Sequence, residues 1–237
     1  MRLYSRTIMV YDILTRVWMK IYIPYRSIHI VAFLLLAFLC YQSHQLVRHL
    51  AGALLCGGFG RMTFTITVTQ QPCKLPLLIT LSGPVWTYAL SWLGMVLLNL
   101  RRFAVWAYAL IFASFSPLRW IQTLSGRGDE LTLAQQWFGT SNRLVVAMAV
   151  LVIGLPPVIV AYRHIANQHR TRVWLGSLLL LLPLLFALLI SNRYVFDEDG
   201  RGGPPAFIFG VPLLVLVVDL MAIVLLVFLA QRIRTPA

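Results

Sequence analysis

The sequence has few charged residues and very few acids. Only 11% of its 237 residues are charged, and seven Asp and Glu residues face 20 Lys and Arg residues. Soluble domains typically carry about 25% charged residues, so this composition excludes an ordinary soluble domain. Because 59% of the residues are hydrophobic, we expect an integral membrane protein.

The net charge of +13 does not indicate a nucleic-acid partner. The basic residues fall in short segments between apolar runs. Loop Lys and Arg take this placement on the cytoplasmic side of membranes, where they also attract anionic lipid. Membrane lipids are therefore the expected partners, and nucleic acid is not.

Cysteine is scarce, and cofactor motifs are missing. Cys40, Cys56 and Cys73 form no CxxC pair and no metal-binding spacing. They are either plain apolar residues or, for Cys56 and Cys73, a disulfide in a loop that faces an oxidising compartment. The sequence has no P-loop, no Rossmann glycines and no nucleophile elbow.

Long apolar runs predict an all-α transmembrane fold with about six membrane helices. The expected spans are residues 28–55, 75–100, 103–115, 144–162, 173–190 and 206–230. Residues 1–27 mix basic and aromatic residues and are expected to form an amphipathic helix at the membrane surface. Twelve Lys and Arg residues on one side against seven on the other favour both termini in the cytoplasm.

A short strand or hairpin is expected directly after the first span. Glycines at 57, 58 and 60 stop the helix, and residues 61–69 alternate threonine with apolar side chains. An open strand edge cannot face lipid. The segment is therefore either an edge to which an extended peptide adds or a solvated connecting loop.

Residues 41–61 continue an apolar run but contain several polar and basic side chains. Ionisable groups inside a membrane span are costly and usually functional. Zinc peptidases of the H-E-x-x-H type place two histidines four residues apart on a helix. Here His44 and His49 are five apart, so about 140° separates them unless a π-bulge intervenes. Arg48 occupies the place of the second histidine. Gln45 stands at the general-base position but cannot take a proton.

The surroundings of this motif resemble the site-2-protease family of intramembrane zinc metallopeptidases. The matching features are residues 44–48 for the zinc motif, 57–69 for a break and strand, Ser82-Gly83-Pro84 for a Gly-Pro span, and Ser116-Pro117 with Gly128-Asp129 for the third ligand. The resemblance implies that His44 keeps the first ligand place and Asp129 the third, while Gln45 and Arg48 replace the base and the second ligand.

Three regions follow from this resemblance: residues 1–27 as a basic amphipathic segment, 28–135 as a protease-like membrane core, and 136–237 as three further membrane helices. The expected function is a catalytically impaired, protease-like protein that binds membrane-protein segments. If it is an active metalloendopeptidase, zinc is the cofactor and His44, His49 and Asp129 bind it. Both histidines could instead be structural, and Arg48 could pair with Asp129.

A different class of function stays open. Asp219 is the one acid deep inside an expected span, and ionisable groups at that depth often mark ion or proton paths. The alternative function is therefore a small transporter or channel-like protein in which Asp219 and Arg48 line a polar path. The two hypotheses differ in space, because the first needs Asp129 near His44 and the second needs Asp219 near Arg48.

Overall fold

The computed structural model describes residues 20–65, 67–69, 73, 75–126, 128–195 and 207–234. Its helices are α2 (Ser27–Cys56), α3 (Pro76–Leu97), α4 (Ala104–Ala113), α5 (Ser116–Leu124), α6 (Asp129–Phe138), α7 (Arg143–His164), α8 (Arg170–Leu179), α9 (Leu181–Val195) and α10 (Leu213–Arg234). Its strands are β1 (Arg61–Met62), β2 (Thr67–Val68), β3 (Phe207–Ile208) and β4 (Val211–Pro212). The predicted all-α class with a small hairpin after the first long helix is confirmed.

Five helical segments are long and apolar enough to cross a membrane, as a multi-pass membrane protein requires. They are α2, residues 104–124 in α4 and α5, α7, residues 170–188 in α8 and α9, and residues 213–233 in α10. The expected second span forms α3 but is not among the five, since polar residues such as Ser82, Thr87 and Ser91 lower its mean hydropathy.

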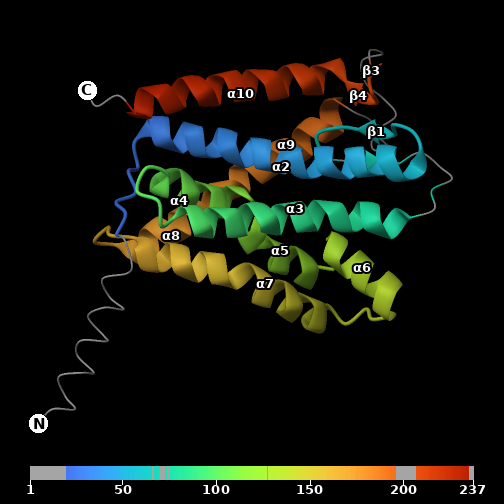
Figure 1. Ribbon diagram of the computed structural model, residues 1–237, viewed down its shortest axis with the longest axis horizontal. Helices are drawn as coiled ribbons and strands as arrows, with labels where there is room; N and C mark the ends of the chain where they lie inside the picture. Colours follow the sequence, from blue (N-terminus) through green and yellow to red (C-terminus); the bar gives the residue numbers. More distant parts are fainter. Residues whose placement is uncertain are drawn as a thin grey trace, which may run out of the picture.

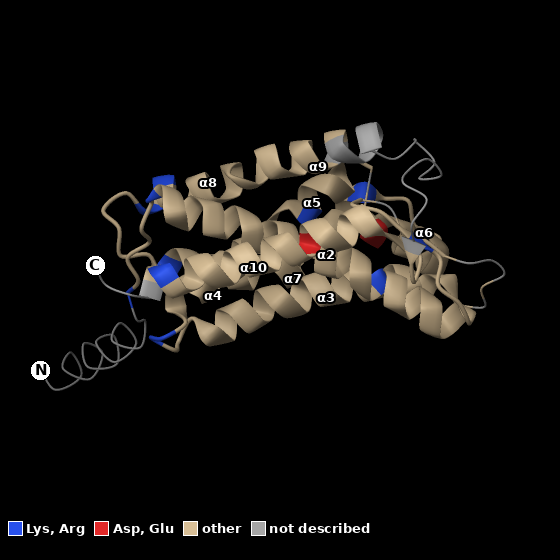
Figure 2. Ribbon diagram, turned by 90° about the horizontal axis from the view of Figure 1, so that it is seen from above, with Lys and Arg blue, Asp and Glu red and all other residues tan. Residues whose placement is uncertain are grey.

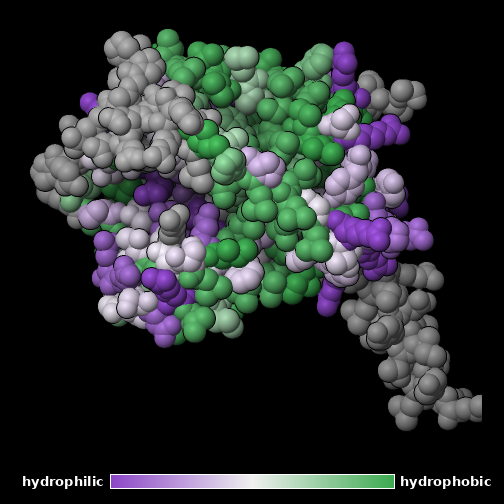
Figure 3. All heavy atoms as spheres, turned by 180° about the vertical axis from the view of Figure 1, so that it is seen from behind, coloured by the Kyte–Doolittle hydropathy of each residue, from purple (hydrophilic) through white to green (hydrophobic). Residues whose placement is uncertain are grey.

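The long helices lie side by side in the order α10, α2, α3 and α7 (Figure 1). α4 packs against α2 and α3, and α5 packs against α7. The main core contains fully buried side chains such as Leu98, Ile111, Phe112 and Leu181. Seen from behind, apolar atoms form a broad central band between two more hydrophilic ends (Figure 3).

Two short antiparallel hairpins meet beside the carboxyl-terminal half of α2. Gly57 ends α2 with φ of 76°, a left-handed conformation that favours glycine. β1 pairs with β2, and the Met62 N–H donates to the Gly210 carbonyl at 3.0 Å, which joins the two hairpins. The β3–β4 hairpin replaces the start of the expected sixth span. Its turn has positive φ at Phe209 and Gly210, so α10 begins only at Leu213.

Two other expectations need correction. Residues 20–26 are not helical, because Ile21 pairs with Ile165 and the Tyr25 hydroxyl donates to the Val173 carbonyl. The rest of the expected amphipathic helix, residues 1–19, lies outside the described part. The expected third span, residues 103–115, is too short: after a break at Phe115, which has φ of 60°, the apolar segment continues through α5 to Leu124.

The two ends of the helix bundle differ in chemistry. Lys and Arg gather at the end that lies near both termini (Figure 2). At the opposite end, Cys56 and Cys73 form a disulfide that links the end of α2 to the approach to α3. Cys40 is free and buried. Of the two possibilities for Cys56 and Cys73, the disulfide is the one found in the structure.

We expect the paired Cys56→Ser and Cys73→Ser variant to lose about 3 kcal/mol of unfolding free energy, since the bridge closes a short loop. Denaturant unfolding in detergent measures this loss. Alkylation of the denatured, unreduced wild type should modify Cys40 alone. Modification of Cys56 or Cys73 without a reductant would contradict the bridge.

Candidate functional site

A polar cavity of about 490 Å³ lies inside the bundle. Side chains from α2, α3, α5 and α6 line it, together with the hairpin residue Thr65 and the loop residues Ser114 and Phe115. Its principal polar residues are His44, Gln45, Arg48, Thr87, Arg119, Gln122 and Asp129. The residues singled out at His44, Arg48 and Asp129 therefore meet in one place, although 81 residues separate the last two.

The Asp129 carboxylate joins the first turn of α6 to α2. Its Oδ1 accepts a hydrogen bond from Arg48 Nη1 at 2.9 Å, and its Oδ2 lies 3.4 Å from His44 Nε2. Arg119 Nη1 lies 3.6 Å from the same Oδ2. Asp129 thus holds both α2 side chains and one side chain of α5, which is the proximity that the protease-like hypothesis requires.

Arg119 and Glu130 form a second, more deeply buried pair. Arg119 Nη1 lies 3.3 Å from Glu130 Oε1, and the Tyr88 hydroxyl donates to the same oxygen at 3.0 Å. None of these three residues was predicted from the sequence. Glu130 directly follows Asp129, and Arg119 lies two residues after Pro117, but no local pattern marks either side chain as part of the site.

Gly83 in α3 makes room for the site. A Cβ built there would lie 2.4 Å from His44 Cε1 and 2.8 Å from Arg48 Cδ. The neighbouring helix therefore approaches α2 closely enough for Thr87 Oγ1 to reach His44 Nδ1 at 2.9 Å. A side chain at position 83 would displace either the imidazole or the arginine.

Both ring nitrogens of His44 have close polar neighbours. Arg119 Nη2 lies 2.9 Å from Nδ1 and 3.3 Å from Nε2. Thr87 Oγ1 also contacts Nδ1, and Asp129 Oδ2 lies 3.4 Å from Nε2. Both ring nitrogens are therefore engaged within the protein.

These residues do not fit a zinc ion. Zinc needs lone pairs from about three protein ligands, whereas Nδ1 of His44 faces a guanidinium and Asp129 is bound by Arg48. Within the described part of the chain, no group of three or more His, Cys, Asp and Glu side chains could hold a metal ion.

His49 lies elsewhere. α2 is an unbroken α-helix through this region, without a π-bulge, so His49 points away from His44. Its Nε2 lies 2.8 Å from the Phe209 carbonyl, and its ring packs near that of Phe59. His49 therefore holds the β3–β4 turn against α2, which is the structural role that the sequence left open.

Gln45 holds the other hairpin. Its Oε1 accepts a hydrogen bond from Thr67 Oγ1 at 2.9 Å, and its Nε2 faces the Thr65 carbonyl at 3.4 Å. Gln42 donates to the Phe64 carbonyl at 3.2 Å. Two consecutive turns of α2 thus bind the β1–β2 hairpin through side-chain amides.

Asp219 does not join the cavity lining. It lies in α10, and its Oδ1 is buried with no hydrogen-bond partner among the described residues. The transport hypothesis needs Asp219 close to Arg48. The ion-pair partner of Arg48 among the described residues is Asp129 instead.

Comparison of the chain with models of protein families, with curated proteins and with solved structures finds no match.

The surroundings of Asp129 keep it ionised. Burial raises the pKa of a carboxyl, but the hydrogen bond from His44 and the charges of Arg48 and Arg119 outweigh burial and lower the pKa of Asp129 from 3.8 to about 2. The cluster of Arg48, Arg119, Asp129 and Glu130 therefore carries two positive and two negative charges.

The lowered pKa predicts a specific acid dependence of stability. Folding depresses this pKa, so the stabilisation from Asp129 is complete above pH 4 and is lost as the pH falls toward 2. Its size is about 2 kcal/mol. Thermal unfolding of wild type and Asp129→Asn from pH 6 to pH 2.5 measures it, with the difference between them shrinking in acid. A constant difference would show that Asp129 stabilises the fold by another means.

Proposed function

We propose that this chain is a site-2-protease-like membrane protein that has lost zinc hydrolysis and acts by binding a segment of another membrane protein. One observation carries the proposal. His44 and Arg48 of α2 meet Asp129 of α6 beside Gly83 of α3, in a polar cavity inside the bundle. These are the positions at which the family resemblance expects two motif residues, the Gly-Pro span and the third ligand.

The impairment follows from the charges at the site. Arg48 is a permanent cation at the place of the second ligand, and its guanidinium binds the carboxylate that would otherwise bind the metal. Gln45, at the general-base position, holds the hairpin with both ends of its amide. The two arginines thus supply positive charge at the place where a metal would bring it.

The β1–β2 hairpin supports binding of an extended segment. The Met62 N–H donates to the Gly210 carbonyl and therefore points away from β2. Met62 faces Thr67 across the hairpin, so these two residues form a non-hydrogen-bonded pair of the antiparallel ladder. The N–H and C=O of Thr67 consequently point away from β1, toward the edge of β2 with which no described strand pairs. A peptide pairing there would run beside Thr65, which lines the polar cavity.

Charge and disulfide together support one orientation. The end of the bundle near both termini is basic, which favours the cytoplasm. The Cys56 to Cys73 bridge lies at the opposite end, and disulfides persist in oxidising compartments. We therefore place the hairpins on the extracytoplasmic side and both termini in the cytoplasm.

The metal part of the proposal is tested by Arg48→His. An imidazole at this position lies one helical turn from His44 and removes the cation that occupies Asp129. Elemental mass spectrometry of detergent-purified protein should find about one zinc per chain in the variant and none in wild type. The matched control is Arg48→Gln, which removes the same charge without adding a ligand and should bind no zinc.

Two results would contradict this part. Zinc in the wild type that disappears in His44→Ala would mean a working metal site. A well-folded Arg48→His variant without zinc would mean that position 48 does not face a ligand place.

Segment binding is tested with a labelled synthetic peptide that has one transmembrane helix and an extended juxtamembrane tail. In nanodiscs, Thr67→Pro should weaken binding at least tenfold, because it removes the outward N–H of β2. Thr67→Ser keeps that N–H and also the hydroxyl that donates to Gln45, so it should bind as wild type does. A tail-less peptide that binds equally well would refute pairing at β2.

A further inference from the structure

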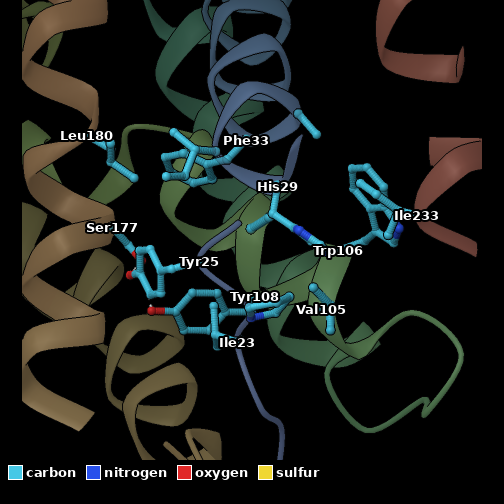
Figure 4. Close-up of a pocket in the computed structure, with 14 residues that line it drawn as sticks. Ile23, Tyr25, His29, Phe33, Val105, Trp106, Tyr108, Ser177, Leu180 and Ile233 are labelled. Carbon is cyan, nitrogen blue, oxygen red and sulfur yellow. Dashed lines mark hydrogen bonds between the residues drawn. The ribbon is translucent and has the colours of Figure 1, made fainter. Parts of the chain in front are cut away.

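A second, narrower pocket lies at the basic end of the bundle, far along α2 from the polar cavity. It has a volume of about 60 Å³ and an almost entirely apolar lining. Figure 4 shows Tyr25, His29 and Phe33 from the start of α2 and the segment before it, facing Trp106 and Tyr108 of α4, with α8 and α10 beside them. We call it the basic-end pocket.

The walls of this pocket are fixed by hydrogen bonds on one side only. The hydroxyls of Tyr25 and Tyr108 lie 3.2 and 3.0 Å from Ser177 Oγ. On the other side, His29 Nδ1 is buried and has no hydrogen-bond partner among the described residues. An unpaired ring nitrogen in such a place is costly, and an oxygen atom of a bound molecule would satisfy it.

Basic side chains surround the pocket. Arg26 directly follows Tyr25, Arg102 precedes α4 by two residues, and Arg232 lies next to the lining residue Ile233. All three are exposed. The described acids are Asp129 and Glu130 of α6 and Asp219 of α10, and none of them lines the basic-end pocket. An apolar pocket with a cationic rim complements an amphipathic anion.

We propose that the basic-end pocket binds an anionic glycerophospholipid of the adjacent leaflet. Part of one acyl chain fills the apolar pocket between Phe33 and Trp106. The phosphate lies on Arg26 and Arg102, and His29 donates from Nδ1 to an ester or phosphate oxygen. Basic pockets between membrane helices hold lipid headgroups in this manner. The proposal is independent of the function proposed for the polar cavity.

Native mass spectrometry of the full chain in detergent tests this proposal with two probes, dioleoyl-phosphatidylglycerol and dioleoyl-phosphatidylcholine. We expect one phosphatidylglycerol to be retained per chain, at least tenfold more strongly than phosphatidylcholine. The double variant Arg26→Gln and Arg102→Gln should lose that preference. The matched control, Arg170→Gln and Arg172→Gln, removes the same charge from the start of α8 and should keep the preference within twofold.

Filling the pocket separates this site from general attraction to a basic surface. Ala109 lines the pocket, so Ala109→Leu should weaken phosphatidylglycerol retention severalfold with all arginines present. His29→Phe keeps the ring shape and removes the nitrogen, and it should weaken retention as well. Equal losses in the two arginine double variants, or unchanged retention in both folded pocket variants, would overturn the proposal.

Discussion

The structure depends on one constraint: polar side chains on a helix surrounded by apolar groups must find partners inside the protein. α2 carries five such side chains in two turns, and three other parts of the chain pair with them. Gln42 and Gln45 hold the first hairpin, His49 holds the second, and His44 and Arg48 hold α6 through Asp129. Both hairpins and α6 are therefore attached to α2, at the end of the bundle that we propose to be extracytoplasmic.

The cluster of Arg48, Arg119, Asp129 and Glu130 is neutral as a whole, and removal of any one of the four leaves a net charge. Buried ion pairs gain little net stability, yet removal of one partner leaves an uncompensated charge that costs about 3–5 kcal/mol. Arg119 is shared between Asp129 and Glu130, so separating α5 from α6 would take this cation from both acids and leave Asp129 paired with Arg48. The charges therefore tie α5 and α6 to each other and to α2.

Hydropathy and local breaks predicted most of the fold. The helix end at Gly57 and the strand alternation after it were readable because backbone conformation and side-chain period are local. The pairing of Arg48 with Asp129 was also weighed, since an arginine in a span needs an acid. The β3–β4 hairpin was missed because its residues are as apolar as a span. Arg119 and Glu130 were missed because their pairing depends on how α5 and α6 pack, which no local pattern encodes.

Gln45 shows why the proposed loss of hydrolysis is built into the fold. The general base of an H-E-x-x-H motif is a carboxylate with a free oxygen. The side chain of Gln45 instead donates to the Thr65 carbonyl and accepts from the Thr67 hydroxyl. A glutamate could meet only the second requirement and would direct a negative charge at a carbonyl oxygen. The same position cannot both activate water and anchor the hairpin. In this chain the hairpin contact prevails, and the proposed pairing edge on β2 depends on it.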